Sequence, residues 1–132
     1  MPEPIVYIDR SIIRSPDIDG LREAVATLTE FVREHEPRLL FYGCEIDETT
    51  STMRVVAVHP DVESLETHLG IGGPEFRKVG AFIDLQQIEV FGRPSAGVLE
   101  QLWQKAAMLG TDARVDVHEL AVGFERLSAF QR

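Results

Sequence analysis

Apolar and polar positions recur along the chain with two different periods. Between Pro4 and Arg14 the period is two, which predicts a strand with one face formed by Ile5, Tyr7, Asp9, Ser11 and Ile13. Ser15-Pro16-Asp17 ends that strand and opens a helix from Ile18 to about Glu36, which Pro37 terminates. The apolar stripe of this helix has a spacing of three or four residues, at Ile18, Leu21, Val25, Leu28 and Val32.

The middle of the chain predicts a hairpin and a broken helix. Strands are expected over Arg38–Asp47 and Met53–His59, joined by a polar loop. Pro60-Asp61 starts a second helix, whose stripe is Val62, Leu65 and Leu69. This helix breaks at Gly72-Gly73 and restarts at Pro74, with the same spacing continuing through Phe76, Val79 and Ile83.

The last third predicts a strand, a helix and a further strand. The strand covers Asp84–Gly92, and Ser95 caps a third helix that ends at Gly110-Thr111-Asp112. Alternation then returns at Val115 and Val117 and continues at Leu120, Val122 and Phe124. The phase slips near Glu119, which indicates a bulge or two short strands.

This order predicts an α+β fold. The sequence β-α-β-β-α-β is typical of a ferredoxin-like sandwich with an antiparallel sheet, here followed by a C-terminal helix and strand. We expect a single domain over residues 1–132, with a core at 4–92 and an extension at 93–132. The first two strands are apolar on both sides, yet two main helices cover only one face. A second copy of the chain is the favoured cover for the other face; the alternative is that the third helix and the tail fold back over it.

The composition excludes some classes of binding partner. The net charge is -9, and Lys and Arg form no cluster, so nucleic acid and anionic membranes are not expected partners. No apolar run approaches a membrane span, and the N-terminus has no leader pattern. The single cysteine, Cys44, is interpreted as a small buried residue in a strand, and it fits a reducing cytoplasm.

Two groups of residues are candidates for chemistry. His68 lies roughly 100° from the apolar stripe of its helix, which predicts a boundary position from which an imidazole can exchange protons with a pocket; the alternative is a surface histidine near a helix C-terminus. Tyr7, Asp9 and Ser11 form a polar row that is expected to line a cleft against the second copy, where burial tunes Asp9 as a base. The alternative is that Asp9 pairs with an arginine or with backbone groups. Glu89 and His59 are further candidates of the same kind.

Metal and phosphate sites are not expected. His59 and His68 are nine residues apart across a strand-to-helix junction, which does not place two ligands on one helical face. The glycines from Gly70 to Gly73 lack the following Lys-Ser/Thr of a phosphate-binding loop, so they are interpreted as a helix break.

The chain resembles the antibiotic-biosynthesis-monooxygenase-like family of dimeric α+β barrels over roughly Ile5 to Gly92. The resemblance rests on the strand-to-helix stretch Arg54–Leu69 and on the segment after it: His68-Leu69 match the family's His-Leu, and Pro74 and Phe76 match its Pro and aromatic residue. The chain departs from the family pattern at His59-Pro60, where an acidic residue and an aromatic are usual, and after Gly92, where no counterpart aligns.

The resemblance implies a homodimer with a largely apolar cleft in each protomer. It implies a cofactor-independent monooxygenase that acts on an aromatic or quinol-type small molecule, with His68 or Asp9 as base and Tyr7 as orienting donor. Ser11, Phe41 and Phe76 are the expected substrate-binding residues, and no cofactor is expected. A haem-degrading activity matches less well, because the expected Asn on the first strand is Asp9. The alternative function is a non-catalytic dimer that binds a small ligand or serves as an accessory protein.

Overall fold

The computed structural model describes residues 3–126 and contains five strands and four helices within them. Their order along the chain is β1 (Ile5–Ile13), α1 (Ile18–His35), β2 (Phe41–Asp47), β3 (Thr52–His59), α2 (Val62–Ile71), α3 (Gly73–Gly80), β4 (Ile83–Phe91), α4 (Ala96–Leu109) and β5 (Arg114–His118). The predicted order of elements is confirmed, and most boundaries agree within a residue or two. The second strand is shorter than predicted, because it starts at Phe41 instead of Arg38.

The strands form one sheet in the order β2-β3-β1-β4-β5. The first four strands are paired antiparallel, as in the ferredoxin-like fold that the sequence predicts. Strand β5 joins the edge of β4 in parallel, since α4 carries the chain back along the sheet before β5 begins. The sheet is therefore mixed, with β1 at its centre, and it does not close into a barrel within one chain.

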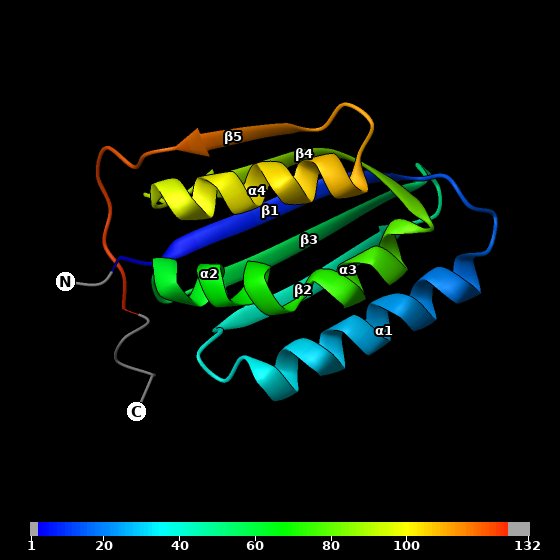
Figure 1. Ribbon diagram of the computed structural model, residues 1–132, viewed down its shortest axis with the longest axis horizontal. Coiled ribbons are helices and arrows are strands. Elements are labelled where there is room, and N and C mark those ends of the chain that lie inside the picture. Colours follow the sequence, from blue (N-terminus) through cyan, green and yellow to red (C-terminus); the bar gives the residue numbers. More distant parts are fainter. Residues whose placement is uncertain (1–2, 127–132) are drawn as a thin grey trace.

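All four helices cover the same face of the sheet (Figure 1). Helix α1 begins where the Asp17 side chain accepts a hydrogen bond from the Gly20 N–H, and its stripe of Leu21, Val25, Leu28 and Val32 is buried. Such burial of an apolar stripe stabilises a helix more than its intrinsic propensity does. Because α4 lies on this face too, the alternative that the third helix covers the opposite face is wrong.

The predicted break in the second helix is confirmed, and it has a packing reason. Helix α2 starts where Asp61 caps the Ser64 N–H and ends at Ile71; α3 begins at Gly73. A Cβ atom on Gly72 would lie 2.3 Å from the Phe76 ring. The glycine thus allows that ring to lie against the backbone of the break, where Phe76 is 3 % exposed.

The uncovered face of the sheet carries a half-buried apolar patch. Cross-strand neighbours on this face are Val6 with Val58 and Ile8 with Val56, and Phe41 on β2 and Phe91 on β4 extend the row. We call these six residues the open-face patch. A sheet face of this composition in contact with water is unusual for an antiparallel sheet, whose solvated face is normally polar.

The tail differs from its prediction. Strand β5 ends at His118, and Leu120, Val122 and Phe124 form no strand. These three side chains are instead 61 %, 89 % and 82 % exposed. The last residue of the predicted strand, 127, lies outside the described residues. None of the helices within residues 3–126 is long and apolar enough to cross a membrane.

Substitutions at two glycines of α4 and its end test how closely this helix packs against the sheet. A Cβ atom on Gly110, at the end of α4, would lie 2.3 Å from the Leu85 carbonyl oxygen, whereas a Cβ atom on Gly97 has no neighbour within 4 Å. We expect Gly110→Ala to lower the free energy of unfolding by about 1–3 kcal/mol, because backbone must move. Gly97→Ala, within the helix, should raise it by about 0.5–1 kcal/mol. Urea denaturation measures both; equal values for the two variants would contradict the close approach at Gly110.

Candidate active site

The central strand places three polar side chains under the helices. Tyr7, Asp9 and Ser11 alternate with outward residues on β1, and they are 0 %, 5 % and 0 % exposed. The Tyr7 hydroxyl donates a hydrogen bond of 2.6 Å to Asp9 Oδ2. The prediction that this row faces a second copy is wrong, because the four helices already cover that face of the sheet.

Helix α4 brings a cation to the same carboxylate. Lys105 Nζ lies 3.8 Å from Asp9 Oδ2 and is 7 % exposed as a residue. The ammonium also lies 4.0 Å from the centre of the Phe76 ring and 4.7 Å from that of Tyr7, which places it between two aromatic faces. The predicted alternative is confirmed in part: Asp9 pairs with Lys105 and Tyr7 instead of an arginine, and it also accepts a backbone hydrogen bond from Val55.

Burial shifts both members of this pair toward their neutral forms. It raises the pKa of Asp9, although the Lys105 charge and the Tyr7 hydrogen bond act against the rise. It lowers the pKa of Lys105, with Asp9 and Glu36 opposing. The pKa of Tyr7 is raised well above its ordinary value, by burial and then by the Asp9 charge, so the phenol remains a proton donor.

A second buried pair joins helix α2 to the end of α1. His68 Nδ1 lies 2.7 Å from Glu36 Oε2, and both side chains are almost completely buried. Burial, followed by the Lys105 charge, lowers the pKa of His68 to about 3, and burial raises the pKa of Glu36 to about 7. The imidazole is accordingly neutral; toward an ionised Glu36 it donates from Nδ1–H and keeps a lone pair on Nε2.

The predicted boundary position of His68 is wrong, since this residue is 0 % exposed. Tyr42 from β2 and Phe76 from α3 pack on the side of α2 that the helical wheel leaves to solvent, with ring centres 5.5 Å and 5.1 Å from the imidazole. The alternative of a surface histidine is wrong for the same reason.

A third buried polar group adjoins this pair. His59 Nδ1 lies 2.8 Å from Ser64 Oγ, and its ring centre lies 5.7 Å from that of His68. Burial, and then the neighbouring His68, lowers its pKa to about 3. Within the described residues, His59 Nε2, His68 Nε2 and Glu36 Oε1 are buried without a hydrogen-bond partner. Buried polar atoms without partners are rare in proteins, and they concentrate where ligands or water bind.

A small cavity of about 20 Å³ connects the Asp9 pair to apolar walls. Asp9, Ser11, Tyr42 and Lys105 form its polar side, and Phe76 and aliphatic side chains from α1, α3, β3 and β4 form the rest. Ser11 Oγ is buried and has no hydrogen-bond partner in the described part of the chain. A volume of this size accommodates about one water molecule, so a larger ligand requires its lining side chains to move.

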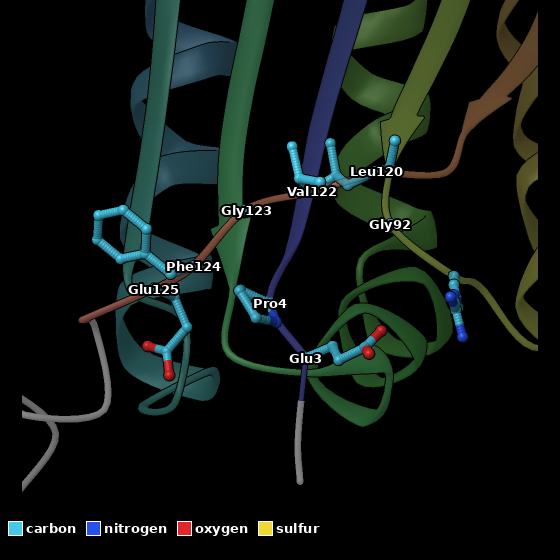
Figure 2. A pocket seen from close by; sticks show the side chains of 10 residues that line it. Glu3, Pro4, Gly92, Leu120, Val122, Gly123, Phe124 and Glu125 are labelled. Atoms are coloured by element: carbon cyan, nitrogen blue, oxygen red, sulfur yellow. The ribbon is translucent and has the colours of Figure 1, made fainter.

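Figure 2 shows a second, larger hollow, of about 330 Å³, where residues 120–125 pass the start of β1 and the end of β4. Pro4, Gly92 and Phe124 are among its lining residues. None of the described side chains that line it is a buried acid or base. The groups suited to proton transfer are therefore at the smaller cavity.

The structure brings together five of the six predicted site residues. Asp9, Ser11 and Phe76 line the cavity. Tyr7 contacts the lining residues Asp9 and Lys105, and His68 contacts the lining rings of Tyr42 and Phe76, but neither Tyr7 nor His68 lines the cavity itself. Phe41 is 54 % exposed and belongs to the open-face patch, so its assignment to this cleft is wrong. The roles assigned to the other five residues remain predictions.

The further candidates lie in different places. His59 is in the interior, whereas Glu89 lies on the uncovered face, where His118 Nε2 approaches its carboxylate to 3.1 Å. Burial raises the pKa of Cys44 to about 12, which keeps it a thiol. No group of three or more metal-ligating side chains is placed to hold an ion within residues 3–126.

Sequence reasoning missed Lys105, Glu36 and Tyr42. A signal for Lys105 is present, because it stands on the stripe of Val98, Leu102 and Leu109, where the spacing calls for an apolar residue. The sequence predicts Glu36 only as the last residue of a helix. Nothing local to the sequence indicates that its side chain turns inward to His68.

Comparisons with known proteins agree with this fold. No protein-family model and no curated protein matches the chain. Among solved structures, MupZ from Pseudomonas fluorescens matches with a TM-score of 0.71 at 19% identity, covering 97% of this chain and 93% of its own. A putative antibiotic biosynthesis monooxygenase from Caulobacter crescentus has a TM-score of 0.61 at 16% identity, covering 67% and 88%. SnoaB from Streptomyces nogalater, a cofactor-independent oxygenase, has a TM-score of 0.59 at 12% identity, and the match covers 71% of this chain and 96% of SnoaB. The expected likeness to antibiotic biosynthesis monooxygenases is confirmed at the level of fold.

The buried histidines predict how stability depends on pH. The pKa values of His59 and His68 are about 3 in the folded chain against an ordinary 6.5, so between these limits the unfolded chain binds more protons. Each histidine should therefore raise the free energy of unfolding by about 1.4 kcal/mol per pH unit as pH rises through this window. Asp9 and Glu36 act in the opposite direction, because their folded pKa values are raised.

His59→Asn keeps a polar partner for Ser64 and removes one of the two titrations. We expect its slope of unfolding free energy against pH, measured by urea denaturation between about pH 4.5 and 6, to be lower than that of the natural chain by about 1.4 kcal/mol per pH unit. His118→Asn, a substitution on the uncovered face of the sheet, is the control. Identical slopes for His59→Asn and the natural chain would show that His59 is protonated in the folded state.

Proposed function

We propose that the protein is a cofactor-independent monooxygenase that acts on an aromatic or quinol-type small molecule held between the sheet and the helices. The observation that carries this proposal is the buried Tyr7–Asp9–Lys105 cluster at one end of a cavity with otherwise apolar walls. The fold shared with SnoaB, itself a cofactor-independent oxygenase, supports the same reaction class. Because a shared fold does not determine a function, the main support for this proposal is the Tyr7–Asp9–Lys105 cluster.

The proposed reaction needs a base, dioxygen and exclusion of water. The base removes a proton from an acidic phenol or from the methylene of an anthrone-type ring, and the electron-rich anion reduces O2. In the overall balance, one ring methylene and one O2 give one ring carbonyl and one water: the carbon is oxidised, and the second oxygen atom leaves with both methylene hydrogens. The interior cavity supplies the dry surroundings that protect the anion and the peroxide that it forms.

Asp9 is the proposed base, because its carboxylate lines the cavity. Burial raises its pKa, which strengthens it as a proton acceptor, and the Tyr7 hydroxyl fixes its orientation. His68 is the second candidate: its Nε2 has no hydrogen-bond partner among the described residues, and Glu36 can stabilise the imidazolium that forms when it takes a proton.

The size of the cavity favours a second candidate function. A volume of about 20 Å³ is far smaller than an aromatic ring, so the chain in this conformation is closed to such a substrate. A non-catalytic dimer that serves as an accessory protein needs no larger space. In the oxygenase proposal, Phe76 and its neighbours on α3 move to admit the substrate.

A homodimer is part of both proposals, and the open-face patch supports it. Val6, Ile8, Val56 and Val58 form the centre of this patch, next to Phe41 and Phe91, on a sheet face that no helix of the described chain covers (Figure 1). A self-complementary apolar face is the usual basis of a two-fold symmetric dimer. We place this dimer in the cytoplasm, because the single cysteine leaves no disulfide within the chain.

Oxygen uptake tests the activity. With a panel of anthrone, naphthoquinol and related phenols, we expect uptake by the natural chain and a turnover rate lower by about 10²–10⁴-fold in Asp9→Asn, which keeps an acceptor for Tyr7 but removes the base. His68→Ala tests the second candidate, and Asp19→Asn on the surface of α1 is the control. The absence of uptake on every compound would count against the oxygenase and favour the accessory function. Unchanged uptake in Asp9→Asn would remove Asp9 from the mechanism.

Sedimentation equilibrium tests the dimer. We expect a mass of twice 14.8 kDa for the natural chain. Ile8→Glu should give a monomer, because it places a carboxylate without a partner at the centre of the open-face patch. Ala26→Glu, an exposed position of α1, should leave the dimer intact. A natural chain that sediments at the mass of one protomer would contradict the proposal.

A further inference from the structure

Lys105 is an under-coordinated cation in the interior of the molecule. The sequence contains only two lysines, Lys78 and Lys105, and the second is 7 % exposed. Its ammonium carries three N–H donors, yet the Asp9 oxygen lies 3.8 Å away, farther than the about 2.7–2.9 Å of a charged hydrogen bond. The rings of Tyr7 and Phe76 provide attraction but no acceptor oxygen. The ammonium can therefore accept a closer anionic partner.

A second, independent observation concerns Ser11. Its side chain is 0 % exposed, its Oγ has no hydrogen-bond partner in the described residues, and it lines the same cavity as Lys105 and Asp9. An unpaired buried hydroxyl costs free energy unless a ligand or a water satisfies it. The cavity thus contains an ammonium and a hydroxyl that both lack a close acceptor.

We propose that Lys105 and Ser11 form an oxyanion-binding subsite, which holds the ionised oxygen of an acidic phenol or enol while Asp9 takes its proton. This inference rests on the ligand class of the proposed function. On binding, the O–H bond of the ligand breaks and an O–H bond forms on the Asp9 carboxylate. The ion pair of Lys105 with Asp9 is replaced by one of Lys105 with the ligand anion, so the net charge of the interior does not change.

The electrostatics of the cluster support this exchange. Burial raises the pKa of Asp9, so the carboxyl accepts a proton more readily than an exposed aspartate does. The charge that remains on Lys105 then acts in surroundings of low dielectric, where its attraction for an oxyanion is stronger than in water. Since Lys105 lies on α4, the inference also gives the C-terminal extension a part in the site: it supplies the cation.

Absorption spectroscopy with two matched probes tests the subsite. The first probe is 4-nitrophenol, whose anion absorbs in the visible; the second is 4-nitroanisole, its methyl ether, which cannot ionise. At a pH below the pKa of the free phenol, addition of the natural chain should produce the visible absorption band of the 4-nitrophenol anion. It should bind the phenol at least about tenfold more tightly than the ether, as expected of one buried ion pair.

Lys105→Met should bind the ether as tightly as the natural chain does. It should bind the phenol no more tightly than the ether, and it should show no anion band. Lys78→Met, which changes the exposed lysine of α3, should behave like the natural chain. Preserved binding of the ether shows that a variant is folded around its cavity. If Lys105→Met loses both probes, the ratio of the two dissociation constants in Lys105→Gln decides in its place.

The outcomes separate this inference from the proposed function. An anion band that persists in Lys105→Met, or binding of both probes by the natural chain without the band, overturns the subsite and leaves an aromatic binding site standing. If neither probe binds to the natural chain, the proposed ligand class fails, and the subsite fails with it.

Discussion

The interior of this protein depends on how the Asp9 carboxylate is neutralised. Asp9 lies on β1, between β3 and β4 and beneath the helices, where water cannot solvate its charge. The Tyr7 hydroxyl and the Lys105 ammonium take the place of that water. A buried ion pair of this kind adds little net stability, but the loss of one partner leaves the other charge with a full desolvation cost. The pair thus penalises any placement of α4 that would separate Lys105 from Asp9.

The charge of Lys105 also reaches the second buried pair. It acts to lower the pKa values of both His68 and Glu36, and therefore opposes a second positive charge on the imidazole while favouring the carboxylate. When Glu36 is ionised, the neutral His68 donates from Nδ1–H to its carboxylate and keeps a lone pair on Nε2. A positive charge on α4 accordingly keeps His68 neutral and lowers its affinity for a proton. This physical link makes the two clusters parts of one polar interior.

The fold is largely predictable from the sequence because the stripe of α1, the glycine break before α3 and the alternation of β1 require only neighbours along the chain. The side of the sheet that each row of side chains faces depends on contacts distant in the sequence. The polarity of Tyr7, Asp9 and Ser11 favours the uncovered face, yet the row lies inside. The wrong boundary position of His68 has the same cause. A helical wheel includes only residues of one helix, whereas the rings that bury His68 come from β2 and α3. A lysine on an apolar stripe, Lys105, is a local signal that points to the site, beside the polar row of β1.

The ferredoxin-like core alone does not complete this interior. Strand β1 supplies the acid, but the cation comes from α4, which follows the core in the chain and is followed by β5 on the edge of β4. Without α4, Asp9 would lose its cation and Phe76 its charged neighbour. The chemistry of the cavity is therefore a property of the core and the extension together.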